Sequence, residues 1–347
     1  MLKEKNFQLA REVFEQAYEL DRANPYILSG LGECLKNLGQ LPEAVTNYEK
    51  LLELEPGNLF ALRGLGDICK IRKDYDRAIF LWLEYLKYRP KDVYVLSRIA
   101  DGYKMLGRYR ESEEYYLKIL GFNPSDTFSF MGLADLYHKT GQQKPAIAHY
   151  EKVLEKSPNL INILTIVGNL YWQCGEVDKA IHHFARALEL DPKNTYAWYG
   201  MGNCYRLNRD YHRVIQCWEP LLETEDVTIA LLSRMGDVYR NVGRFDDAET
   251  VYLRGLSRGY NRFAQLGLLK LYCLQGRDQE VCGDIEVLFD HEGADLSILD
   301  ELCGFFLQSG RKESAIRLIR CIMERPDLRP GELQVLAART AELEGTD

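Results

Sequence analysis

The sequence predicts an all-α solenoid, a fold in which pairs of helices stack one after another along the chain. Three observations predict it: small residues, large aromatic residues and prolines each return at intervals of 34 residues. Between these markers, apolar residues recur three and four positions apart, which places them on one face of a helix. Each period therefore contains two amphipathic helices joined by a short turn.

The stretch from 161 to 194 shows one complete period. Leu164 and Val167 lie on one face of a first helix, and Gly175 is expected to end that helix in the left-handed cap conformation. A second helix then carries Phe184 on its apolar face, and Pro192 stops it.

The markers keep this register along the chain. Glycine and alanine permit close approach of a neighbouring side chain or helix, so we expect close contacts at the small position of the first helix. That position is occupied by Gly32, Gly66, Ala100, Ala134, Gly168, Gly202 and Gly236. The aromatic position of the second helix is occupied by Tyr48, Trp82, Tyr116, Tyr150, Phe184, Trp218 and Tyr252. The prolines are Pro56, Pro90, Pro124, Pro158 and Pro192.

These residues resemble the tetratricopeptide repeat (TPR) family, whose repeat is a helix–turn–helix of the same length. The resemblance implies a right-handed superhelix of such repeats. We interpret residues 1–24 as the second helix of a half repeat, 25–261 as seven regular repeats, 262–329 as two divergent repeats, and 330–347 as a capping helix. Residues 290–295 are expected to form a polar loop. Because a half repeat near Met1 exposes an apolar face, we expect a longer natural chain or a cover at this end.

Composition excludes several classes of function. The net charge of −8 disfavours binding to nucleic acid or to an anionic membrane, both of which require a basic surface. No apolar stretch is long enough to span a bilayer, and residues 1–14 lack the apolar run of a secretory signal. The nine cysteines are scattered without a CxxC pair, which predicts free thiols, with Cys69, Cys204 and Cys303 in the interior. Free thiols predict a reducing compartment, and we expect the cytoplasm.

Catalytic and metal-binding patterns are missing from the sequence. It contains no GxxxxGK phosphate loop and no HExxH. The adjacent His182 and His183 point to different sides of a helix, so they do not grip one metal ion. We therefore expect no catalytic residue, no metal site and no cofactor.

The resemblance also implies where a ligand binds, because in this family the first helix of each repeat lines a concave groove. Its second, fifth, sixth, ninth and twelfth positions point into the groove. The ninth position carries polar residues: Glu33, Asp67, Asp101, Asp135, Asn169, Asn203 and Asp237. The twelfth carries mostly basic ones: Lys36, Lys70, Lys104, His138, Trp172, Arg206 and Arg240. Two interpretations remain open: local ion pairs on a solvated face, or a polar ladder that hydrogen-bonds an extended peptide.

The second position carries a row of aromatic residues: Tyr26, Phe60, Tyr94, Phe128 and Tyr196, with Asn162 as the exception. Each ring either covers the turn of the preceding repeat or offers a surface on which a ligand stacks. Arg63, Arg98 and Arg234 add cations beside the ladder, and if the ligand is acidic, its expected place is near Arg98, Lys70 and Lys104. The residue combination with which relatives bind the acidic C-termini of chaperones is absent.

These observations predict a non-catalytic scaffold or adaptor that binds a peptide or protein segment in the groove. Two alternatives remain. In the first alternative, the array is the substrate-recognition arm of a larger enzyme, such as a glycosyltransferase. Otherwise it is a self-assembly module that forms homo-oligomers through exposed apolar residues of the divergent repeats, such as Phe263 and Phe289.

Overall fold

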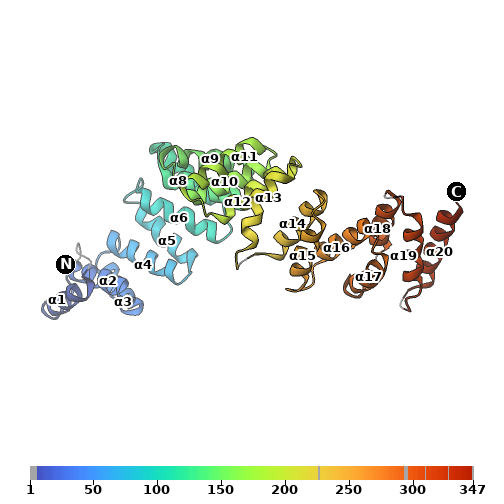
Figure 1. Cartoon of the computed structure of the whole chain (residues 1–347). Helices are drawn as coiled ribbons and strands as arrows, with labels where there is room; N and C mark the ends of the chain where they lie inside the picture. Colours follow the sequence, from blue (N-terminus) through green and yellow to red (C-terminus); the bar gives the residue numbers. More distant parts are fainter. Residues whose placement is uncertain (1–5, 226, 293–295, 309, 327, 346–347) are drawn as a thin grey trace. The chain divides into compact units, whose positions relative to one another are not determined.

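The computed structural model describes residues 6–225, 227–292, 296–308, 310–326 and 328–345, and all regular structure within these ranges is α-helical. Figure 1 shows these helices coloured in chain order, from blue at the N-terminus to red at the C-terminus. They fall into two compact units, Met1–Glu176 (unit 1) and Val177–Asp347 (unit 2). The expected all-α repeat fold is confirmed, and each unit is described by itself below.

Unit 1 contains the first ten helices. Each helix packs on the next one, and first helices of neighbouring repeats also touch, as α2 and α4 do. The helices are α1 (Phe7–Leu20), α2 (Pro25–Asn37), α3 (Leu41–Leu54), α4 (Leu59–Ile71), α5 (Tyr75–Leu86), α6 (Val93–Met105), α7 (Tyr109–Phe122), α8 (Thr127–Lys139), α9 (Gln143–Lys156) and α10 (Ile161–Gln173).

Unit 2 repeats the arrangement with ten more helices, α14 packing on both α15 and α16. They are α11 (Val177–Leu190), α12 (Thr195–Leu207), α13 (Tyr211–Leu222), α14 (Ile229–Asn241), α15 (Phe245–Leu256), α16 (Arg262–Gln275), α17 (Asp278–Glu292), α18 (Leu296–Gln308), α19 (Lys312–Met323) and α20 (Pro330–Gly345).

Polar side chains start most first helices. An Asn, Asp or Thr just before the helix accepts a backbone N–H from its first turn, which satisfies a donor that the helix leaves unpaired. These caps are Asn24, Asn58, Asp92, Asp126, Asn194, Thr228 and Asn261.

The turn inside a repeat depends on a left-handed residue. Glycine supplies it in most repeats, as Gly175 does with φ of 79°, which confirms the expected cap. Lys73 and Arg209 adopt the same conformation with φ of 62° and 56°, at a cost of about 1–2 kcal/mol each because their Cβ approaches the backbone. These two turns therefore carry strain that the glycine turns avoid.

Each of the seven regular repeats buries one aromatic ring of its second helix in the core. The rings of Tyr48 in unit 1 and Tyr252 in unit 2 are almost fully buried. A Cβ added to Gly32 would approach the Tyr48 ring within 2.5 Å, and one added to Gly64 of the next repeat within 2.4 Å. The small positions predicted from the sequence therefore make room for a ring of the second helix, flanked on both sides by helix backbone.

Three sequence expectations need correction. Helix α17 continues to Glu292, so residues 290–292 are helical rather than a loop, and residues 293–295 lie outside the described residues. Phe289 is only 2% exposed because it faces the core of unit 2, so it is not an exposed apolar residue. Cys69 is half-buried rather than interior, whereas Cys204 and Cys303 are buried as expected. In the range 1–24, interpreted as a half repeat, the structure has the single helix α1, and residues 1–5 lie outside the described residues.

Candidate functional site

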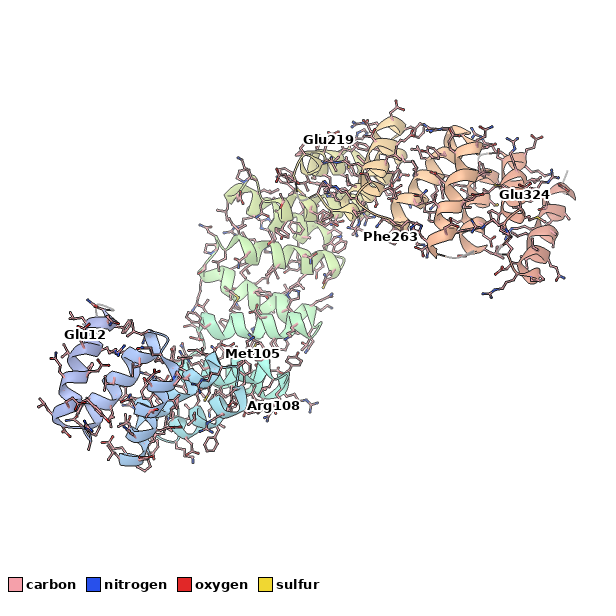
Figure 2. The ribbon with its side chains drawn as sticks, turned by 90° about the horizontal axis from the view of Figure 1, so that it is seen from below. Glu12, Met105, Arg108, Glu219, Phe263 and Glu324 are labelled. Carbon is pink, nitrogen blue, oxygen red and sulfur yellow. The ribbon has the colours of Figure 1, made fainter. Side chains whose placement is uncertain are left out.

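The aromatic side chains at the second position of the first helices point to solvent. Tyr26 is 86% exposed, Phe128 81% and Tyr196 79%, and Phe60 and Tyr94 are also more than half exposed. Rings that covered the preceding turn would lose most of their exposed area, so packing within the repeat does not account for this row. The same register places Phe263 second in α16, where it is 72% exposed (Figure 2).

A pocket lies between two members of the row in unit 1. It has a volume of about 470 Å³ and is lined mainly by apolar groups, with Tyr26 and Phe60 on its walls. Ser29 and Gly30, the fifth and sixth residues of α2, line the same pocket. Phe14 of α1 also lines it and is the ring against which a Cβ on Gly30 would collide. The second, fifth and sixth positions therefore meet around one concavity.

The acids of the ninth position are held by the buried tyrosines of their own repeats. Tyr116 donates a hydrogen bond of 2.6 Å to Asp101, and Tyr150 one of 2.7 Å to Asp135. In unit 2, Tyr252 donates to Asp237 at 2.7 Å. Burial and the neighbouring carboxylate raise the pKa of each tyrosine, so the hydroxyl stays protonated and donates. These acids therefore have a structural role, whatever they do for a ligand.

Local ion pairs account for part of the ladder. Lys36 contacts Glu33 at 2.7 Å and Lys104 contacts Asp101 at 3.3 Å, and in unit 2 Arg240 contacts Asp237 at 3.0 Å. Each pair is three residues apart on one helix, as predicted. Because Asp101 and Asp135 also accept the hydroxyl groups of Tyr116 and Tyr150, we expect removal of either carboxylate to lower the stability of the fold.

Asp67 departs from this pattern because the aromatic residue of its repeat, Trp82, has no hydroxyl. Its carboxylate forms an ion pair with Arg98 of the next repeat and lies 3.8 Å from Lys36 of the preceding one. Burial raises the pKa of Asp67 to about 6, although Lys36 and Arg63 oppose the shift. Arg98 therefore does not offer a free cation, and the acidic ligand expected beside it would have to displace Asp67.

Aromatic rings also hold the cations of this face. The Arg98 guanidinium lies 3.9 Å from the Tyr94 ring centroid and also donates to the Tyr94 hydroxyl. Burial lowers the pKa of Arg98 to about 10. Arg63 lies 5.8 Å from the Phe60 ring centroid. Lys70, at the twelfth position, is exposed. The fold brings Arg98 and Asp67 together. Among the described residues, neither Lys70 nor Lys104 forms an ion pair with Asp67, and Lys104 contacts Asp101 instead.

In unit 2 the candidate residues come together on α12 and α14. Arg234 donates to the hydroxyl of Tyr199, and its guanidinium lies 5.8 Å from that ring's centroid. Asn203 follows Tyr199 by one turn of α12 and is 6% exposed. Arg206 follows three residues later on the same helix. Asn169, the remaining candidate on α10 of unit 1, is exposed.

Two parts of this face were not identified from the sequence. Tyr199 was overlooked because the fifth position shows no repeated chemistry. Lys270, at the ninth position of α16, forms an ion pair with Glu301 at the sixth position of α18. The Asp67–Arg98 pair joins the same two positions with the charges exchanged. This register rule, ninth position to sixth position of the next repeat, could have been found by comparing charges across repeats.

Neither a metal-binding group of side chains nor a membrane-spanning helix occurs in the described ranges. No three His, Cys, Asp or Glu side chains there form a group that could hold a metal ion. Among the same residues, no helix has both the length and the apolar character needed to cross a membrane.

The sequence matches models of one repeat family along four stretches. Models described as tetratricopeptide repeat match residues 1–66, 129–160 and 231–262, and one described as TPR repeat matches residues 168–208. No curated protein matches the chain.

Solved structures with the same fold are also found. The C-terminal part of a TPR repeat-containing protein from Cytophaga hutchinsonii is 17% identical, with 66% of this chain and 95% of that chain covered and a TM-score of 0.59. A tetratricopeptide repeat protein from Parabacteroides merdae is 20% identical over 71% and 98% of the two chains, with a TM-score of 0.49. YrrB, described as a TPR protein with an unusual peptide-binding site, is 19% identical over 55% and 98%, with a TM-score of 0.47.

At these sequence identities the solved structures support the fold alone. Of these three, the Cytophaga protein supports it, because its TM-score is above 0.5. The four matched stretches add the family. With the repeat pattern matched along the sequence and the same fold found in its helices, the chain belongs to the tetratricopeptide repeat family.

Proposed function

We propose that the chain is a non-catalytic scaffold that holds a peptide or an extended protein segment against the first helices of its repeats. Membership of this repeat family supports a protein-interaction scaffold. The observation that carries the finer proposal is the row of solvent-exposed rings at the second position, which no packing requirement explains. Exposed aromatic side chains are the residues that contribute most to protein–protein binding.

The pocket between Tyr26 and Phe60 supports this proposal, because it offers an apolar side chain a place beside the row. Asn58 and Glu55 also line the pocket, and their side chains are hydrogen-bonded to each other at 2.7 Å. The nine cysteines are free, which suits a binding protein of a reducing compartment such as the cytoplasm.

The alternative of self-assembly loses half of its motivation, since Phe289 is buried. Phe263 stays exposed, but its register makes it a member of the second-position row. We therefore assign it to the ligand-binding face rather than to a separate interface.

The test is selection from a random peptide library displayed on phage. The binding variant removes two exposed rings of unit 1, Tyr26→Ala with Phe128→Ala. The matched control removes two exposed apolar side chains from second helices, Phe80→Ala of α5 and Leu117→Ala of α7. All four side chains are largely or partly exposed, so neither pair should unfold the protein, and helical circular dichroism checks this.

We expect the wild type and the control to enrich the same peptides and the binding variant to recover them at least about tenfold less, the effect of ~1.4 kcal/mol. Equal recovery by the binding variant would show that peptides bind elsewhere. No enrichment by the wild type would show that this face does not bind peptides.

A further inference from the structure

Two pairs of repeats, one in each unit, share a sequence that the other repeats lack. The segment GLGDICKIRKDYDRAIFLW begins at residue 64, and GMGNCYRLNRDYHRVIQCW begins 136 residues later, at 200. Both are followed at the same distance by LSR, at 96 and 232. The offset equals four repeats, so both copies keep the repeat register.

The structure shows that the two copies also share local geometry. The non-glycine turn residues Lys73 and Arg209 both have positive φ. The next residue caps the second helix in each copy, Asp74 accepting the N–H of Arg77 and Asp210 that of Arg213. The buried indoles Trp82 and Trp218 occupy equivalent positions, and so do the sixth-position arginines Arg98 and Arg234 that follow them.

One difference between the copies changes their charge. At the ninth position the first copy has Asp67, which forms an ion pair with Arg98. The second copy has Asn203, which removes the negative charge. In the described part of the chain, Arg234 and Arg206 have no ion pair with an acidic side chain. Asp237, the ninth-position acid of α14, is bound by Arg240 and Tyr252.

Two unpaired buried groups lie at this place. The Asn203 side chain is 6% exposed and its Oδ1 has no hydrogen-bond partner, and the Arg206 Nε is also buried without one. Buried polar atoms are normally paired, so each of these atoms is short of a partner that the chain does not supply. Arg234 is held in place by the Tyr199 hydroxyl, and Tyr199 in turn stacks on Trp218 with ring centroids 5.7 Å apart. The arginine is therefore oriented before any ligand arrives.

We propose that Asn203, Arg206 and Arg234 form a subsite for an acidic residue of the bound peptide, whereas the equivalent subsite in unit 1 is closed by Asp67. Guanidinium groups bind carboxylates through paired N–H donors, and the asparagine amide donates to and accepts from a peptide backbone. The ligand chemistry is thus a side-chain carboxylate of Asp or Glu within an extended segment. This inference rests on the proposed function.

The test uses the peptides selected by the full-length wild type from the phage library, in which the peptide's own C-terminus is fused and offers no carboxylate. A selected peptide containing Asp or Glu is synthesised together with its Asn or Gln counterpart. The dissociation constants of both are measured by fluorescence anisotropy. The readout is the ratio of the two constants, which does not depend on how tightly the rest of the peptide binds.

For the wild type we expect the acidic peptide to bind roughly tenfold more tightly than its neutral counterpart. Asn203→Asp supplies the missing carboxylate with almost no change of shape, so the ratio should fall to about one. Arg234→Gln should do the same. The matched control is Arg213→Gln on α13, in the repeat that carries Asn203 and Arg206. The Arg213 side chain is 61% exposed, and its removal should leave the ratio unchanged.

The reverse exchange tests the closed copy. Asp67→Asn frees Arg98, so for peptides that engage unit 1 the preference for the acidic form should increase. The outcomes separate the two proposals. Selected peptides without Asp or Glu enrichment, or a ratio that survives both Asn203→Asp and Arg234→Gln, overturn the acidic subsite and leave the scaffold standing. No selected peptide at all overturns the scaffold and the subsite together.

Discussion

At the scale of single residues, the ninth position has two different roles that depend on its neighbour. Where the second helix supplies a tyrosine, as in Tyr116 or Tyr150, the acid accepts its buried hydroxyl. Where the second helix supplies Trp82, the acid turns to Arg98 of the next repeat instead. The same carboxylate is therefore a structural acceptor in one repeat and a charge partner in another.

The hydrogen bond to Tyr116 predicts a stability cost for removing Asp101. Asp101→Ala leaves a buried hydroxyl without its acceptor, so we expect the free energy of unfolding to fall by ~1–3 kcal/mol. Urea unfolding followed by circular dichroism measures it. Glu114→Ala on α7, an exposed acid, serves as the control and should change stability by less than ~0.5 kcal/mol. Equal stability of the two variants would contradict a structural role for the ninth-position acid.

Asp67 predicts a pH dependence. Its pKa is raised to about 6 by burial, against about 3.9 for an unfolded aspartate. The folded chain binds this proton more tightly, so the resulting stability is complete below about pH 4 and is lost as the pH rises through about 6. Relative to Asp67→Asn, the wild type should lose up to ~2–3 kcal/mol over that interval. Urea unfolding of both proteins at several pH values measures the difference, and a difference that is independent of pH would disprove the raised pKa.

At the scale of helices, packing depends on glycines that border an aromatic ring. A Cβ at Gly236 would lie 2.4 Å from the Tyr252 ring, and one at Gly267 on the other side would lie equally close. The ring is therefore enclosed by two helix backbones and has little space to shift. Ala100 and Ala134 occupy the small position in other repeats.

This enclosure predicts opposite effects for two glycine substitutions within helices of unit 2. Gly236→Ala should destabilise the protein by ~1–3 kcal/mol, because the methyl group displaces the ring. Gly283→Ala of α17, whose added Cβ meets nothing within 4 Å, should stabilise it by ~0.5–1 kcal/mol through helix propensity. Thermal unfolding of the two variants decides between this account and a general tolerance of the small position, which would give both the same sign.

At the scale of the whole molecule, the main contacts among the described helices join helices that are one or two positions apart in the chain, such as α4 with α3, α5 and α2. Stability in such an array is a sum over repeats and their interfaces. A local defect should therefore stay local.

The two buried tryptophans provide a matched test of this locality. Trp82→Ala should cost ~3–5 kcal/mol and increase hydrogen exchange in α4–α6 while leaving α14–α17 protected. Trp218→Ala should give the complementary pattern, with α12–α14 exposed to exchange and α2–α5 protected. Mass-spectrometric hydrogen exchange on the full chain reads both. A uniform loss of protection in either variant would show that the array unfolds as one cooperative body.

The repeat fold could be predicted from the sequence because its determinants are local and repeated. A glycine such as Gly175 ends a helix through its own backbone conformation. Aromatic residues such as Trp82 and Tyr116 return at the same buried position of each second helix. Exposure of the Tyr26 and Phe128 rings was one of two open interpretations, since solvent exposure depends on which neighbours reach the ring. Phe289 was misjudged for the same reason.

The sequence by itself determined the period, the helix pairs and the positions of the ring and the small residue, because each of these depends on neighbours within one repeat. Only the tertiary structure decided the partners between repeats. It joined Asp67 to Arg98, gave Asp101 to Tyr116, and left the Asn203 Oδ1 and the Arg206 Nε buried without partners. Those contacts depend on distances between side chains of successive repeats. The repeat register predicts which positions lie on the same face, but it does not predict which side chains are close enough to touch.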